Sequence, residues 1–114
     1  MGVKTTIALA GLAALVLSSI PAQAQRTRFQ GIAQCSRHAS VQFSRHDSSF
    51  RRFVIERVSV QDEKFAHLVG NQFVSTVYYG RALYENAAGP KRVRFVCLHA
   101  GSSKGPVFVY AMPE

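Results

Sequence analysis

The residues of this sequence best suited to bind a ligand are basic side chains that lie close in sequence to aromatic ones. The chain carries 14 Lys+Arg against 6 Asp+Glu, a formal net charge of +8, and such a charge favours anionic partners. Arginine can grip phosphate or carboxylate groups while exposed aromatic rings stack on a base or a sugar. The candidate anion-binding residues form two groups, Arg45, Arg51 and Arg52, and then Lys91, Arg92 and Arg94. The alternative is that these residues form a solvated face that only keeps the protein in solution.

Catalytic and metal-binding patterns are not found in the sequence. The four histidines stand at no metal-ligand spacing from one another, from cysteine or from carboxylates. No G-x-S-x-G motif marks a nucleophilic serine, and no pair of carboxylates suggests a glycosidase. The segment 101–105, GSSKG, loosely suggests an anion-binding nest but is more typical of a hairpin turn. We expect a non-catalytic protein without metal or cofactor, the alternative being a small enzyme that uses His46 or His99.

The only two cysteines, Cys35 and Cys97, are expected to form one disulfide bond. Exported proteins pair an even number of cysteines, and no C-x-x-C redox motif is present. Closure of a loop of about 60 residues would contribute roughly 4 kcal/mol, a large part of the stability of a small domain. A catalytic thiol is the alternative.

Residues 1–24 are interpreted as a cleaved secretory signal peptide. A weakly basic start at Lys4 precedes an uncharged apolar run, residues 7–17, which is too short to span a bilayer as a helix. Ala22, Gln23 and Ala24 form an A-x-A cleavage site, and an uncleaved anchor is the alternative. Cleavage removes Lys4 from the total of +8, so that residues 25–114 form a single small domain of charge +7. We expect an exported protein, periplasmic or extracellular.

Residues 28–44 are expected to form a helix. Thr27 and Gln30 have the spacing of a capping box, which predicts the start of the helix there. The residues expected on the buried stripe fall within one third of the helical circle: Phe29, Ile32, Cys35, Ser36, Ala39 and Phe43. A pair of short strands is the alternative, because Val41 and Phe43 alternate with polar residues.

Four later segments are rich in β-branched and aromatic residues and are expected to form strands: 53–60, 72–84, 91–99 and 107–111. In the first segment the alternation shifts, which suggests either a bulge near Glu56 and Arg57 or a strand with both faces partly covered. In the second, Gly80 suggests a bulge or a bend. Residues 61–64 are interpreted as a polar turn, and residues 65–69 are compatible with either a helical turn or a strand before the turn at Gly70 and Asn71.

The order of these elements predicts an α+β fold in which an N-terminal helix packs on a three- to four-stranded, mainly antiparallel meander. Cys35 lies on the apolar stripe of the helix, and Cys97 shares a strand face with Val93 and Phe95. One disulfide would therefore hold the helix to the centre of the sheet. The two arginines of that strand would point to the opposite face.

The leading functional hypothesis is a non-catalytic, exported domain that binds an anionic lipid, a glycan or an acidic protein of the cell envelope through its arginines. Nucleic acid is also anionic, but no nucleic-acid-binding module is recognisable. Two further hypotheses remain. One is an inhibitor or modulator of an envelope enzyme that acts through loop 45–52 or 100–106. The other is a purely structural envelope protein.

Overall fold

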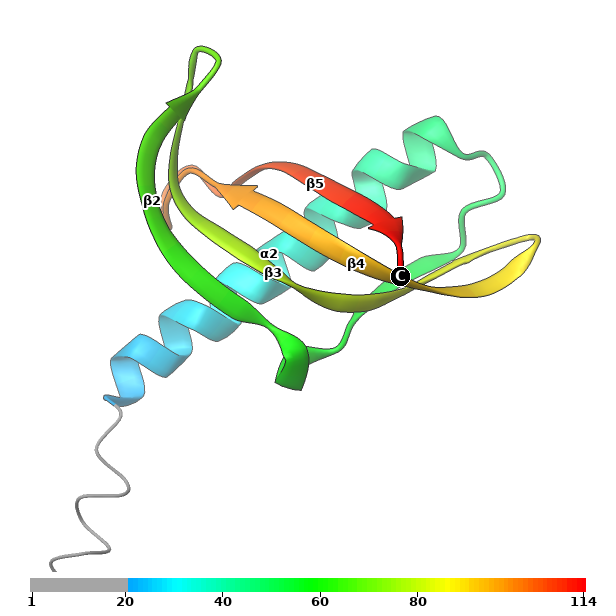
Figure 1. Ribbon diagram of the computed structural model, residues 1–114, viewed down its shortest axis with the longest axis horizontal. Coiled ribbons are helices and arrows are strands. Elements are labelled where there is room, and N and C mark those ends of the chain that lie inside the picture. The colour runs from blue at the N-terminus through cyan, green and yellow to red at the C-terminus, as the bar shows by residue number, and fades with distance from the viewer. Residues whose placement is uncertain (1–20) are drawn as a thin grey trace, which may run out of the picture.

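A computed structural model describes residues 21–114 as one helix packed on an antiparallel sheet of five strands, which confirms the predicted α+β fold (Figure 1). Residues 1–20, which hold most of the expected signal peptide, lie outside the described residues. Within residues 21–114, no helix is long and apolar enough to cross a membrane. The elements are α2 (Ala22–His46), β1 (Arg52–Ile55), the 3₁₀ helix η1 (Arg57–Ser59), β2 (Gln61–Val69), β3 (Gln72–Asn86), β4 (Gly89–His99) and β5 (Pro106–Pro113).

Helix α2 is longer than the sequence predicts, and its expected capping box is wrong. The Oγ1 of Thr27 donates to the carbonyl of Gln23 at 3.0 Å, so Thr27 lies inside the helix, which begins at Ala22. The Thr-x-x-Gln spacing also occurs within helices, because Thr can bond to the carbonyl four residues earlier. The predicted apolar stripe is correct for Ile32, Cys35 and Ala39, which are buried, and for Phe43, which packs against the core. It is wrong for Phe29, which is 53% exposed and takes no part in the core.

The sheet has the order β1-β3-β4-β5, and β2 also pairs with β3. Strands β1 and β2 lie end to end along one edge of β3, opposite Ala82–Glu85 and Gln72–Tyr79 respectively. Helix α2 crosses behind β3, β4 and β5 in Figure 1, and no described segment covers the other side of these strands. We call that other side the outer face.

The edge strands differ most from the sequence expectations. The segment 53–60 is not one bulged strand, because β1 ends at Ile55 and the 3₁₀ turn η1 follows. Residues 61–64 are not a turn but the start of β2, where an edge position leaves polar side chains in solvent. Residues 65–69 continue that strand, and Gly70 and Asn71 form the expected two-residue turn. A register shift between Lys64 and His67 marks a bulge.

The core lies between α2 and the inward side chains of β3, β4 and β5. Cys35 and Cys97 form the predicted disulfide with their Cα atoms 6.1 Å apart, and both are fully buried. Val93 and Phe95 are buried beside Cys97, as predicted, while the intervening arginines are exposed. The disulfide therefore links the helix to a central strand.

Candidate anion-binding face of the sheet

The six candidate residues from the sequence are not brought together into one site. Arg45 lies in the last turn of α2, and Arg51 precedes β1. Arg52 on β1 forms an ion pair with Glu85, with an Nη2–Oε1 distance of 3.3 Å. The other three residues lie on β4: Lys91, Arg92 and Arg94.

Strand pleating divides the three basic residues of β4 between two faces. Lys91 is opposite Tyr84, whose ring packs against the core on the helix side. Arg92 and Arg94 have the opposite parity and point to the outer face. Within residues 21–114, neither arginine forms an ion pair with a carboxylate. The outer face therefore carries two basic groups without an acidic partner.

Strand register places a third arginine on the same face. Arg81 of β3 lies directly opposite Arg94 of β4, and Arg94 lies opposite Met112 of β5. Like charges at directly opposite positions of an antiparallel pair destabilise the sheet. An anion bound beside Arg94 would reduce that repulsion.

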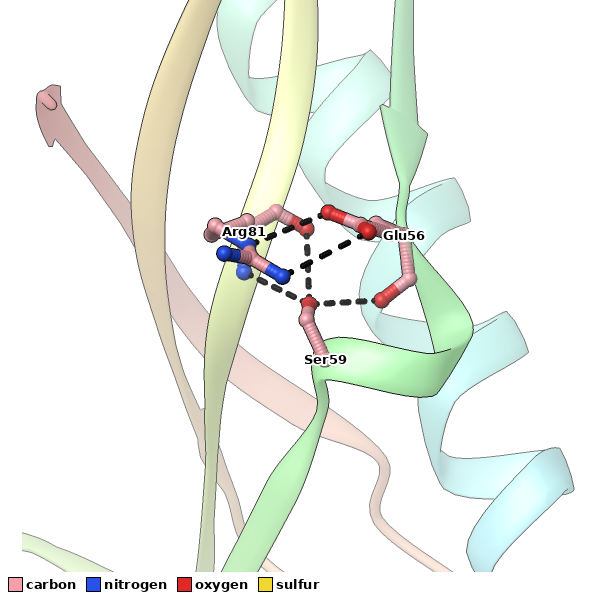
Figure 2. A network of polar contacts seen from close by, with 3 residues as sticks. All are labelled: Glu56, Ser59 and Arg81. Atoms are coloured by element: carbon pink, nitrogen blue, oxygen red, sulfur yellow. Dashed lines mark hydrogen bonds and ion pairs between the residues drawn. The ribbon is translucent and has the colours of Figure 1, made fainter.

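The charge of Arg81 is partly balanced from the edge of the sheet (Figure 2). Its Nε lies 3.1 Å from Oε2 of Glu56, the residue that precedes η1. Ser59 completes the network, because its Oγ donates to the Glu56 carbonyl at 2.7 Å and accepts from the Arg81 backbone N–H at 2.9 Å. The network fixes both the Arg81 side chain and the turn η1.

Gly80 allows η1 to approach the sheet, and the bulge that the sequence suggested at this residue is absent. The pairing of β3 with β4 continues through Gly80 without a shift. A Cβ at this position would lie 2.9 Å from Oγ of Ser59 and 3.1 Å from Cα of Val60. Glycine is therefore required here by the close approach of another backbone.

Two shallow hollows on the outer face share Arg81 in their walls. The first, of about 500 Å³, also contains Arg92 but has the acidic residues Glu56 and Glu114 beside it. The second, of about 560 Å³, contains Arg81 and Arg94 and no carboxylate. Its remaining walls are mixed, with the polar residues Ser59 and Gln61 beside Val58, Tyr79, Val96 and Met112. We call this second one the Arg94 hollow, and it is the better candidate for anion binding.

The histidines that the sequence offered for catalysis take different positions. His46 is exposed in the last turn of α2, while His99 is only 3% exposed. The backbone N–H of Gly101 donates to Nδ1 of His99, so Nε2 carries the proton and donates to Oε1 of Gln34 at 2.7 Å. Burial lowers the pKa of His99 and favours the neutral ring. Both ring nitrogens of His99 are thus engaged within the fold.

No group of three His, Cys, Asp or Glu side chains within residues 21–114 is arranged to hold a metal ion. The structural feature that the sequence interpretation missed is Arg81. Its signal was present, because the two-residue turn at Ala87 and Ala88 pairs Asn86 with Gly89 and thereby places Arg81 opposite Arg94. Comparison of the chain with protein-family models, curated proteins and solved structures gives no match.

Proposed function

We propose that this protein is an exported, non-catalytic binding domain that takes an anionic partner on the outer face of its sheet. The observation that carries the proposal is Arg94, which forms no ion pair within residues 21–114 and stands directly opposite Arg81, whose charge Glu56 balances only in part. An anionic group there would accept charge-assisted hydrogen bonds from the guanidinium groups and relieve their mutual repulsion. Arg92, on the same strand face, adds a third positive charge nearby.

Export is supported by the sequence pattern of residues 1–24 and by the disulfide. Structural disulfides persist in oxidising compartments and are rare in the cytosol. Mass measurement of the protein purified from an envelope or culture fraction tests this part. A chain that begins at Gln25 is the expected product, and a chain that retains residues 1–24 would contradict cleavage.

Binding is tested with heparin as a soluble polyanion, by titration at several salt concentrations. The double variant Arg92→Gln/Arg94→Gln is expected to bind roughly tenfold more weakly, since each lost contact is worth up to about 1 kcal/mol. The dependence of affinity on salt should also become shallower, because fewer counterions are released. Both side chains are exposed and unpaired among residues 21–114, so the fold should tolerate the changes.

The matched control is Arg45→Gln/Arg51→Gln, which removes the same two charges at exposed positions away from the outer face. This control should retain most of the heparin affinity. Equal losses in the two double variants would mean that net charge alone drives binding, and the proposed site would then be wrong.

A further inference from the structure

The outer face is apolar over two rows of paired residues where these cross β3, β4 and β5, and each row ends in a polar residue of β2, Gln61 or Glu63. In an ordinary antiparallel sheet with one covered face, the residues of the other face are polar. Here the two successive rows across β3, β4 and β5 are Tyr79–Val96–Tyr110 and Val77–Leu98–Phe108. Tyr110 is 55% exposed and Phe108 is 44% exposed. An apolar surface of this kind marks an interaction site.

The arginine row lies immediately beside these apolar rows. Arg81, Arg94 and Met112 form the row adjacent to Tyr79, Val96 and Tyr110, because Arg94 and Val96 are two positions apart on β4. Alternate residues of a strand are roughly 7 Å apart. Positive groups and aromatic rings therefore stand next to each other on one uncovered surface.

A third apolar feature lies next to the arginines. Val58 is 92% exposed at the tip of η1, and it forms part of the wall of the Arg94 hollow. The network of Glu56, Ser59 and Arg81 holds this turn in place, so the exposed valine is presented by a rigid element (Figure 2).

This order of groups matches the surface of an anionic bilayer more closely than it matches a soluble polyanion. A bilayer presents phosphate groups next to acyl chains, and proteins meet this boundary with arginine or lysine beside aromatic and aliphatic side chains. A soluble polyanion would use the arginines but would leave the apolar rows in water. A two-fold pair of these faces would bring the unpaired arginines of both copies into one interface, where like charges oppose association.

We infer that the anionic partner is a lipid bilayer containing acidic phospholipids, with Phe108 and Tyr110 in contact with the bilayer and Arg92 and Arg94 at its phosphate groups. This inference rests on the proposed function and specifies its partner. The single acidic residue at the edge of the apolar rows, Glu63, accepts a hydrogen bond from the hydroxyl of Tyr79 at 2.8 Å.

The test is cosedimentation of the disulfide-bonded protein, in the form in which the cell accumulates it, with phosphatidylglycerol–phosphatidylcholine vesicles and with pure phosphatidylcholine vesicles. Binding is expected only with the anionic vesicles. Arg92→Gln/Arg94→Gln should weaken it roughly 30-fold, because each basic residue at such a surface contributes about a factor of five.

The apolar rows are tested separately with Phe108→Ser/Tyr110→Ser. This double variant should bind anionic vesicles at least about tenfold more weakly, since both side chains lose burial in the bilayer. Its affinity for heparin should not change. The matched control is Phe29→Ser/Val41→Ser, which alters two helix residues that are 53% and 52% exposed away from the sheet face, and it should bind vesicles like the unaltered protein.

A second measurement tests directly whether the apolar rows contact the bilayer, without relying on a difference in vesicle affinity. The protein has no tryptophan, so Tyr110→Trp introduces a single tryptophan, whose emission can be followed, into the apolar rows. Brominated lipids in anionic vesicles should quench its emission, and soluble heparin should not.

Three outcomes would overturn the lipid inference: unchanged vesicle binding by Phe108→Ser/Tyr110→Ser, unquenched emission of Tyr110→Trp, or a dimer in sedimentation equilibrium that Phe108→Ser/Tyr110→Ser dissociates. In each case the proposed function would still stand if Arg92→Gln/Arg94→Gln weakens heparin binding. Loss of the arginine effect on heparin would refute both proposals together.

Discussion

The side chain of Gln42 in α2 bonds to both backbone groups of Val109 in β5. Its Nε2 donates to the Val109 carbonyl at 2.6 Å, and its Oε1 accepts from the Val109 N–H at 2.9 Å. Val109 is opposite Cys97 in the sheet, and its backbone groups point to the free side of β5. The side-chain amide of Gln42 thus takes up the free backbone hydrogen bonds at the middle of an edge strand, which could otherwise pair with another chain.

Replacement of Gln42 is therefore expected to affect both stability and association. Gln42→Ala leaves two partly buried backbone groups without a partner and should lower the free energy of unfolding by about 1–3 kcal/mol. Gln42→Glu should be at least as harmful, because a carboxylate would face the Val109 carbonyl. Urea unfolding measures the first effect, and size-exclusion chromatography measures association through β5. The control is Gln30→Ala, at an exposed helix position. Equal effects of the two alanine variants would show that Gln42 does not protect the edge of β5.

Reduction of the Cys35–Cys97 disulfide should strongly destabilise the protein. The bond closes a loop with a sequence separation of 62, and loss of this constraint costs about 4 kcal/mol. The midpoint of urea unfolding should therefore fall sharply for reduced protein and for Cys35→Ala/Cys97→Ala. Identical midpoints for oxidised and reduced protein would show that packing alone holds the helix to the sheet.

Gly31→Ala should destabilise the protein although alanine favours helices. A Cβ at position 31 would lie 2.2 Å from Oη and 2.6 Å from Cζ of Tyr78, which is buried. The gain in helix propensity is about 1 kcal/mol, whereas overpacking costs about 1–3 kcal/mol. A double-mutant cycle supplies the control: in a Tyr78→Ala background the obstacle is gone, and Gly31→Ala should become stabilising. If Gly31→Ala changed the free energy of unfolding in the same direction in both backgrounds, this packing argument would be wrong.

Asp47 should make the free energy of unfolding depend on pH in the acidic range. Hydrogen bonds from Asn86 (2.9 Å), Tyr84 (2.7 Å) and Ser49 hold the pKa of this carboxyl well below its usual value. Because the folded-state pKa is depressed, the stabilisation is present above the unfolded-state pKa of 3.8 and is lost as the pH falls through the lower folded-state pKa. Burial and the bond to Asp47 raise the pKa of Tyr84 to about 12, so its hydroxyl keeps donating over this range.

Urea unfolding of the unaltered protein and of Asp47→Asn, compared at about pH 6 and about pH 2, checks this prediction. The unaltered protein should be the more stable of the two at the higher pH. The difference between them should shrink at the lower pH, because the Asp47 carboxyl gains a proton in the unfolded chain before it does so in the folded protein. A difference that does not change with pH would show that Asp47 contributes through its shape and not through its charge.

Local periodicity accounts for what could be predicted from the sequence. The stripe that contains Ile32 and Cys35 follows the helical repeat, and the alternation of Val93, Phe95 and Cys97 follows the strand repeat. The wrong start of the helix and the wrong turn at residues 61–64 have one cause in common. Polar residues near a cap or a turn have the same composition as polar residues in a helix interior or on an exposed edge strand, so composition alone cannot separate them.

The repeats within single elements predict correctly that Ile32, Cys35 and Ala39 of the helix and Val93, Phe95 and Cys97 of one strand face the core. They also place Arg92 and Arg94 on the other face of that strand, and the cysteine count predicts the disulfide. The structure was needed to establish the length of the turn that places Arg81 opposite Arg94, the interruption of the sheet edge by η1 beside Gly80, and the apolar rows across three strands. The first set depends on the repeat of one helix or one strand. The second depends on the register between strands and on contacts between distant segments, which the repeat within a single strand does not specify.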